Sequence, residues 1–129
     1  MRIRLLAMDL DGTLLNSDKV ITPRTLQALQ RAQAMGVRTT IATGRMSSSA
    51  EYFGRQMDAN APLVCCNGGM VQAMGEDEPL FARYLAPIVV RRLLTLCHER
   101  DWYVQWYIGK DILAEDFRPE YFQAYRTVR

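Results

Sequence analysis

The sequence is poor in three residue types that often carry chemistry. Its 129 residues include one histidine, two lysines and three cysteines. A single histidine, His98, argues against a catalytic triad, and attraction to a helix dipole explains its place near a predicted helix end. No CxxC spacing occurs, and the adjacent pair Cys65 and Cys66 is typical of a buried strand rather than a redox or metal site. This use of cysteine favours a reducing, cytoplasmic location.

Long apolar runs and a large net charge are also missing. No apolar run approaches the roughly 18 residues that cross a bilayer. The apolar start is interrupted by Asp9 and Asp11, which excludes a signal-peptide core. Sixteen basic and fourteen acidic residues leave a net charge of +2, which gives no reason to expect nucleic acid as a partner. We therefore expect a globular chain with neither a membrane nor a nucleic-acid partner.

Strand and helix signals alternate in the first part of the chain. Short apolar or β-branched runs predict buried strands, and amphipathic stretches predict helices. The predicted strands are 3–8, 37–42 and 63–66, and the predicted helices are 22–36 and 47–57. Residues 12–21 have a polar tip and predict a small hairpin or flap. Strands that alternate with helices indicate the α/β class with a parallel, right-handed sheet.

The pattern changes after Gly75, where an acidic connector, 76–79, begins. Beyond it the sequence predicts short strands around a helix at 87–100, and a last helix at 119–126. Alternating aromatic residues at 102–108 are more typical of a sheet core than of a stacking surface. We therefore expect a first domain at 1–78 and the beginning of an α+β module at 79–129.

The strongest chemical signal is the string Asp9-Leu10-Asp11-Gly12-Thr13-Leu14-Leu15, directly after the first predicted strand. Open α/β sheets bind ligands at the carboxyl ends of their strands. If the chain bends at Gly12, both carboxylates face one crevice. Like charges that close favour one ionised acid and one acid of raised pKa, which suits a nucleophile with a general acid. The pair also suits Mg²⁺, so Asp9 and Asp11 are candidate metal ligands.

Two other interpretations of this string compete with the catalytic one. The acids can be solvated groups at a capped turn between strand and flap. A calcium loop of the EF-hand type fails, because Gly12 directly follows the second acid and no glutamate closes a twelve-residue loop.

Weaker signals follow the second and third predicted strands. Thr43-Gly44-Arg45 offers a hydroxyl, a close backbone approach and a guanidinium that can pair bidentately with phosphate. A simple helix-capping turn with a surface arginine is the alternative. Asn67-Gly68-Gly69 predicts either a hairpin turn or groups that line the same crevice near a substrate.

Taken in order, the DxDGTLL, TGR and NGG strings resemble the haloacid dehalogenase-like (HAD) superfamily of phosphohydrolases, and more closely its Cof-type branch. The resemblance implies a Rossmann-like core with a cap domain, acting on a small phosphorylated metabolite such as a sugar phosphate. It implies that Asp9 is the nucleophile and forms an aspartyl-phosphate, that Asp11 is the acid and then the base, and that Thr43 binds the phosphoryl group. It places Mg²⁺ on the Asp9 carboxylate and the Asp11 backbone carbonyl. The candidate substrate-binding residues are Gly12, Gly44, Arg45, Asn67 and Gly68.

Two elements of that family have no counterpart in these 129 residues. They are a later lysine and an acidic GDxxND-type string, since no Gly-Asp pair occurs and Lys19 and Lys110 lie in the flap and the cap. We therefore expect a chain truncated within the cap, with impaired activity. Its strand 3–8 becomes an exposed edge, open to a second copy or to a missing C-terminal portion. The alternative function is a non-catalytic module that binds phosphate, Mg²⁺ or a partner chain.

Overall fold

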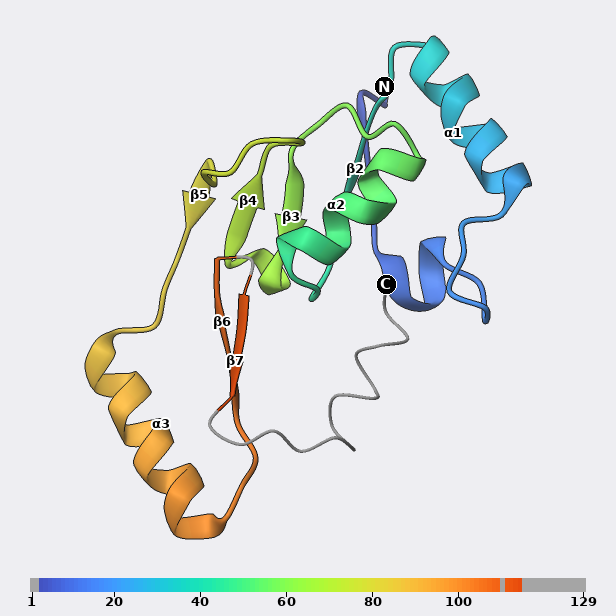
Figure 1. Ribbon diagram of the computed structural model, residues 1–129. Coiled ribbons are helices and arrows are strands. Elements are labelled where there is room, and N and C mark those ends of the chain that lie inside the picture. The colour runs from blue at the N-terminus through green and yellow to red at the C-terminus, as the bar shows by residue number, and fades with distance from the viewer. Residues whose placement is uncertain (1–2, 110, 115–129) are drawn as a thin grey trace. The chain divides into compact units, whose positions relative to one another are not determined.

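The computed structural model describes residues 3–109 and 111–114, and the chain divides into two compact units, Met1–Ala82 and Arg83–Arg129. Figure 1 shows their helices and strands. The first unit contains every segment to which the sequence assigned site residues. No described helix combines the length and the apolarity that crossing a membrane requires.

Parallel strands form the first part of the sheet. Strand β1 (Leu5–Met8) pairs in parallel with β2 (Arg38–Ile41), with Ala7 opposite Thr40. Strand β3 (Leu63–Cys65) joins them through one parallel bridge between Ala42 and Val64. This arrangement confirms the predicted α/β class.

The sheet continues with antiparallel strands. Strand β4 (Met70–Gln72) pairs with β3, and β5 (Phe81–Ala82) pairs with β4. A short 3-10 turn at Cys66–Gly68 leads from β3 toward β4, so the hairpin expected around Asn67 is present. Because β5 pairs with β4, the compact first unit extends to Ala82, and the boundary expected after residue 78 stays a prediction.

Two helices link the parallel strands (Figure 1). Helix α1 (Pro23–Ala34) begins after Thr22, whose hydroxyl oxygen accepts the Thr25 backbone N–H at 3.2 Å. Proline is tolerated at this first position because its missing N–H would have had no partner inside the helix. Helix α2 (Ser47–Gln56) follows β2 and contacts β3. Both helices were predicted.

The core of the first unit lies between these helices and the sheet. Its buried side chains are Leu10, Leu14, Leu15, Ile21, Leu29, Ile41, Ala50, Phe53, Met57, Leu63, Cys65 and Met70. The first four of them lie beside or within the predicted flap, on both sides of its polar tip. The flap is therefore held to the core on both sides, which limits its movement.

The first strand differs from the prediction of a strand buried on both faces. Leu5 is 54% exposed and Leu6 is 37% exposed. Among the described residues β1 pairs only with β2, and so it forms an edge of the sheet. Burial was overestimated because an apolar run does not reveal which elements pack on the two faces of the strand.

The segment after β1 forms a helical turn rather than a strand hairpin. Residues Leu10–Leu14 make one wide turn, which Gly12 interrupts with a φ of 73°. This left-handed conformation costs glycine little, and it reverses the chain after Asp11. A second turn follows, in which the Asn16 side-chain oxygen accepts the backbone N–H groups of Asp18 and Val20, both at 3.0 Å.

The second unit has a helix and a hairpin. Helix α3 (Pro87–Arg100) has the predicted bounds, and β6 (Gln105–Ile108) pairs antiparallel with β7 (Asp111–Ala114). None of the described residues of this unit is buried. The helix predicted at 119–126 lies outside the described residues.

Candidate functional site

A cavity of about 640 Å³ opens at the carboxyl ends of the three parallel strands. This is the edge at which open α/β sheets bind ligands. The lining residues come from the segments after β1, β2 and β3: Asp9, Asp11, Ala42, Thr43, Gly44, Arg45, Val64, Asn67 and Gly68. Three segments far apart in sequence therefore meet at one pocket.

The structure brings together all but one of the predicted site residues. Gly12 is the exception, because it does not line the cavity. Its position explains its presence in the motif, since the turn at Gly12 directs Asp11 back to the pocket that Asp9 also lines. The sequence did not single out Ala42 and Val64, whose apolar side chains carried no chemical signal.

Main-chain hydrogen bonds join the two loops that form one wall of the pocket. The Thr43 N–H donates to the Val64 carbonyl at 2.9 Å, and the Thr43 carbonyl accepts the Asn67 N–H at 3.1 Å. The Cys66 N–H donates to the Arg45 carbonyl at 2.9 Å. These bonds fix the separation of the loops without using any side chain.

Thr43, Gly44 and Asn67 are tightly arranged within that wall. Thr43 is buried, and its hydroxyl oxygen accepts the Arg45 N–H at 3.2 Å. A Cβ atom on Gly44 would lie only 2.9 Å from the Asn67 Oδ1 atom. A side chain at position 44 would therefore displace the Asn67 side-chain amide from its place in the pocket.

Asp11 is bound by two cations. The Arg45 Nε atom lies 2.7 Å from Asp11 Oδ2, and the Arg45 Nη2 atom lies 2.7 Å from Asp11 Oδ1. The Lys19 Nζ atom approaches the same Oδ1 atom at 2.9 Å. Arginine thus makes the two-point contact that is typical of guanidinium and carboxylate groups.

This arrangement changes the expected electrostatics of the acid pair. The Arg45 guanidinium and, after it, the Lys19 ammonium hold the pKa of Asp11 well below its ordinary value. The prediction of a raised pKa for the acid partner is therefore wrong for Asp11 in this arrangement. Two neighbouring cations stabilise its charged form more than partial burial destabilises it.

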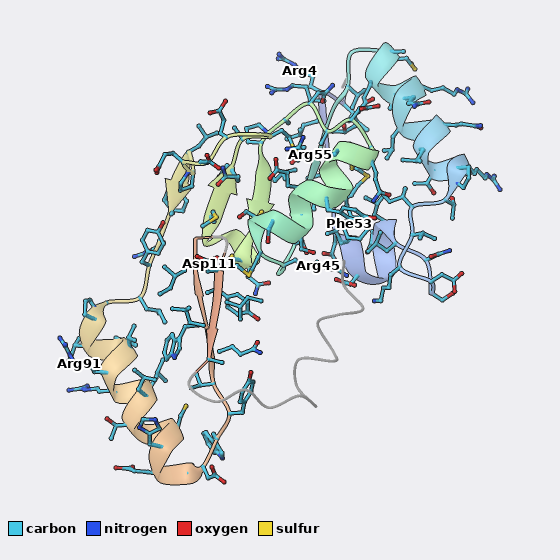
Figure 2. The ribbon with its side chains drawn as sticks, in the orientation of Figure 1. Arg4, Arg45, Phe53, Arg55, Arg91 and Asp111 are labelled. Carbon is cyan, nitrogen blue, oxygen red and sulfur yellow. The ribbon has the colours of Figure 1, made fainter. Side chains whose placement is uncertain are left out.

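Arg45 is itself held in place on its other side. Its Nη1 atom donates to the Ser49 hydroxyl at 3.1 Å, and its guanidinium lies 5.3 Å from the centre of the Phe53 ring. Figure 2 shows Arg45 beside Phe53 of α2. Only 13% of the Arg45 side chain is exposed. The sequence predicted a phosphate partner for this arginine, whereas in the structure its partner is Asp11.

Lys19 is the site neighbour that sequence reasoning missed. Its position in the flap does not match the family's later lysine, and no role was expected for it. Its backbone φ of 59° is in the left-handed region, in the turn that Asn16 closes. The Asn-Ser-Asp-Lys turn signal was visible in the sequence, but nothing in it gave the direction of the lysine.

The oxygen ligands that meet here fit Mg²⁺. Asp9 and Asp11 line the same pocket as Thr43, the Asp11 carboxylate being engaged by Arg45 and Lys19, and Mg²⁺ is commonly bound by one or two carboxylates, with waters and other oxygens completing its shell. No group of three or more histidine, cysteine or acidic residues is placed to hold a metal within the described ranges. The donor set therefore suits a hard ion that keeps part of its hydration shell.

Comparison with known proteins identifies the family. A family model described as haloacid dehalogenase-like hydrolase matches residues 6–128. This chain is a haloacid dehalogenase-like hydrolase family member. The family resemblance found in the three motifs is confirmed, and so is the likeness to its phosphatases.

Curated relatives in the family are phosphatases. The chain is 30% identical over 115 residues to "Pyridoxal phosphate phosphatase YbhA" of Escherichia coli, covering 89% of this chain and 42% of that protein. It is 34% identical over 121 residues to "5-amino-6-(5-phospho-D-ribitylamino)uracil phosphatase YitU" of Bacillus subtilis, covering 92% of this chain and 42% of that protein. The chain therefore spans about two-fifths of the length of these HAD-family relatives.

Solved structures show the same fold. A haloacid dehalogenase-like hydrolase from Bacteroides thetaiotaomicron superposes with a TM-score of 0.86 at 26% identity, covering 98% of this chain and 49% of that one. A protein from Thermotoga maritima superposes with a TM-score of 0.80 at 22% identity, covering 97% of this chain and 46% of that one. The HAD fold of the chain is thus shown.

Proposed function

We propose that this chain carries the nucleophile-bearing part of a Mg²⁺-dependent phosphohydrolase that cleaves phosphate monoesters of small metabolites. The single observation that carries the proposal is the pocket shared by Asp9, Asp11, Thr43 and Arg45 at the carboxyl ends of three parallel strands. Phosphoryl transfer depends on in-line positioning and charge neutralisation, and these four side chains supply a nucleophile, an acid–base group, a hydrogen-bonding group and a cation.

Each residue has a distinct role in the proposed reaction. Asp9 attacks phosphorus, and the bond between phosphorus and the oxygen of the leaving alcohol breaks. Asp11 protonates that oxygen, which requires its carboxyl to give up the Arg45 contact that keeps it ionised in this arrangement, and it later takes a proton from the water that hydrolyses the aspartyl-phosphate. Thr43 binds the phosphoryl group. Gly12, Gly44, Arg45, Asn67 and Gly68 shape the substrate-binding side of the pocket or bind the substrate there.

Mg²⁺ would be held by the Asp9 carboxylate and the Asp11 backbone carbonyl. When bound, it supplies charge neutralisation for the phosphoryl oxygens. The Asp11 carboxylate is engaged by Arg45 and Lys19, which agrees with a backbone rather than a side-chain ligand at this position. The two roles proposed for Asp11 therefore use different atoms.

The names of the relatives suggest a more specific substrate class. Pyridoxal phosphate and a phosphoribitylamino-uracil appear in the names of two of them, and both compounds carry a phosphate ester on a side chain of a nitrogen-containing ring. We propose esters of this class as substrates, and pyridoxal phosphate is the first compound to test.

The rate expected of this chain is low. It spans about two-fifths of the length of those relatives, and the lysine and the acidic string that the family resemblance calls for do not occur in its sequence. We therefore expect a rate reduced about 10²–10³-fold for each missing electrostatic contact.

The decisive experiment measures hydrolysis of p-nitrophenyl phosphate and pyridoxal phosphate with Mg²⁺ and with EDTA. We expect slow, Mg²⁺-dependent release of phosphate that Asp9→Asn abolishes. Asp18→Asn is the matched control, because Asp18 is an exposed acid in the nearby flap and does not line the pocket. Undiminished Mg²⁺-dependent turnover in Asp9→Asn would refute the assignment of the nucleophile.

A second candidate function rests on the exposed edge strand β1. In this case the chain is a non-catalytic module that binds phosphate or Mg²⁺ in the pocket and a second chain along β1. The partner would be a further copy or a C-terminal portion of the same protein, and backbone pairing would supply the contact. Stoichiometric partner binding without any turnover of either ester would favour this function over hydrolysis.

A further inference from the structure

The geometry around Asp11 points to an exchange of partners that accompanies phosphate binding. We propose that Asp11 and a phosphate group compete for Arg45, and that Lys19 keeps hold of Asp11 when Arg45 turns to the phosphate. The inference rests on the proposed function, because it assumes that phosphate enters the pocket.

The first observation is that Asp11 occupies the binding face of Arg45. Both contacts are 2.7 Å long, and they use the Nε and Nη2 atoms together. Phosphate oxygens take the same two-point geometry on a guanidinium. The carboxylate therefore stands where a phosphate would bind, and the two anions cannot use that face together.

The second observation is that Arg45 cannot avoid the competition by moving into solvent. The Ser49 hydroxyl and the Phe53 ring hold its guanidinium against α2, and its side chain is only 13% exposed. Its partner must therefore come from the pocket. A small change of partner within the pocket leaves both of these outer contacts in place.

The third observation is that Asp11 has another cation available. Lys19 contacts Oδ1 alone, at 2.9 Å, and approaches from the flap rather than from β2. The Asn16 side chain closes its turn, and the buried residues Leu15 and Ile21 anchor the flap on the two sides of its tip. Asp11 thus retains a charge partner after losing Arg45, which lowers the cost of the exchange.

Inorganic phosphate is the probe for a double-mutant cycle on the full 129-residue chain, with EDTA present so that divalent cations play no part. Asp11→Asn removes the competing anion and should tighten phosphate binding about tenfold while Arg45 is present. In the Arg45→Gln background the same substitution should increase phosphate affinity no more than about threefold, because it relieves only the general repulsion between two negative charges.

Equal gains in the two backgrounds would overturn the competition for Arg45, as would no detectable binding to Asp11→Asn at tens of millimolar phosphate. Circular dichroism confirms that each variant is folded. The outcome for the exchange can be told apart from the outcome for the proposed function. If ester hydrolysis depends on Asp9 but Asp11→Asn increases phosphate affinity equally in both backgrounds, only the exchange is refuted. If the unsubstituted chain hydrolyses neither ester but Asp11→Asn increases phosphate affinity more when Arg45 is present, only the catalytic proposal is refuted.

A measurement on the unsubstituted chain avoids any doubt about folding. The ¹⁵N signal of the Arg45 Nε–H group, assigned by its loss in Arg45→Lys, should shift as phosphate is added, since its acceptor changes from carboxylate to phosphate. An Nε–H signal that stays fixed while phosphate saturates the chain contradicts the exchange.

Lys19 is tested by Lys19→Met, which leaves Asp11 with Arg45 as its one strong partner. Phosphate binding should weaken about threefold, because Asp11 then competes harder for the arginine. Arg24→Met is the matched control, since it removes one exposed positive charge from the first turn of α1. Equal effects of the two substitutions would show that Lys19 acts only through general charge, and would overturn its part in the exchange.

Discussion

The two units of the chain differ most in what they bury. The first unit packs a dozen apolar side chains into one core and carries the whole candidate site. In the second unit, α3 presents Val90, Leu94 and Cys97 half-buried, and none of the described residues reaches full burial. Burial of apolar area is the main stabilising contribution to a fold. Strong secondary-structure signals are therefore not sufficient evidence of a stable unit.

The fluorescence of the chain separates the two units experimentally. Both tryptophans, Trp102 and Trp106, belong to the second unit. Tryptophan fluorescence consequently reports on the second unit, whereas the far-ultraviolet circular dichroism contains the signals of α1, α2 and α3 from both units. Comparing the unfolding curves from the two signals shows whether the second unit unfolds more easily than the first.

The largest effect is expected from a pair of matched leucines on helices. Leu29 of α1 is 4% exposed, and Leu29→Ala should lower the free energy of unfolding by about 2–5 kcal/mol through lost burial and a cavity. Leu94→Ala in α3 should cost less than about 1 kcal/mol. Urea unfolding followed by circular dichroism measures both. Similar losses at the two positions would contradict the contrast between the units.

The next effect concerns two glycines. Gly44→Ala pushes the Asn67 side chain from its place and should weaken phosphate binding about tenfold. Gly109→Ala in the second unit introduces strain at a φ of 60°, costing about 1 kcal/mol, but should leave phosphate affinity unchanged. Isothermal titration with phosphate distinguishes them. The site would extend beyond the first unit if Gly109→Ala weakened binding as much as Gly44→Ala.

A smaller effect comes from the buried thiol of the first unit. Burial, and then the neighbouring Cys66, raise the pKa of Cys65 from 9.0 to about 11. Below pH 9 the thiol is neutral in the folded and in the unfolded chain, and its contribution to the free energy of unfolding is fully present. Between pH 9 and 11 only the unfolded chain releases the proton, so the free energy of unfolding should fall, by about 1 kcal/mol at pH 10.

Cys65→Ala removes this contribution, so its free energy of unfolding should depend less steeply on pH between the ordinary and the raised pKa of the thiol. Cys97→Ala, at a half-buried position of the second unit, is the matched control. Parallel pH profiles for Cys65→Ala and the unsubstituted chain would show that the buried thiol does not contribute.

The smallest effect on stability is expected at the edge of the first unit. Leu5→Lys places a charge on β1, where the leucine is 54% exposed, and should change the free energy of unfolding by less than about 0.5 kcal/mol. It should nevertheless reduce self-association, because charged edge strands resist pairing. Light scattering over a wide concentration range measures this, with Val20→Lys as the control. A chain that is monomeric throughout, before any substitution, would rule out association through β1.

Local signals predicted most of the elements. Thr22 and Pro23 mark the start of α1 because a cap and a fixed φ act within one turn. Pro87 marks the start of α3 by its fixed φ alone, since Ala86 before it makes no side-chain cap. The convergence of Asp9 and Thr43 was predictable because the carboxyl ends of parallel strands share one edge. Each of these inferences needs only neighbouring residues or a general rule of topology.

Features that depend on contacts distant in sequence were missed. The exposed fraction of the Leu5 side chain depends on which elements pack against the faces of β1. The partner of Arg45 is 34 residues away along the chain. A two-point ion pair with Asp11 depends on the closeness of two loops, which sequence spacing does not give.

The main-chain bonds between the loops after β2 and β3 have a consequence for changing this protein. Because Thr43, Arg45 and their partners are joined through backbone atoms, a substitution of a side chain there keeps these main-chain hydrogen bonds. Mutagenesis aimed at new ligands therefore has a fixed spacing of the two loops to build on, and natural divergence of specificity has the same starting point.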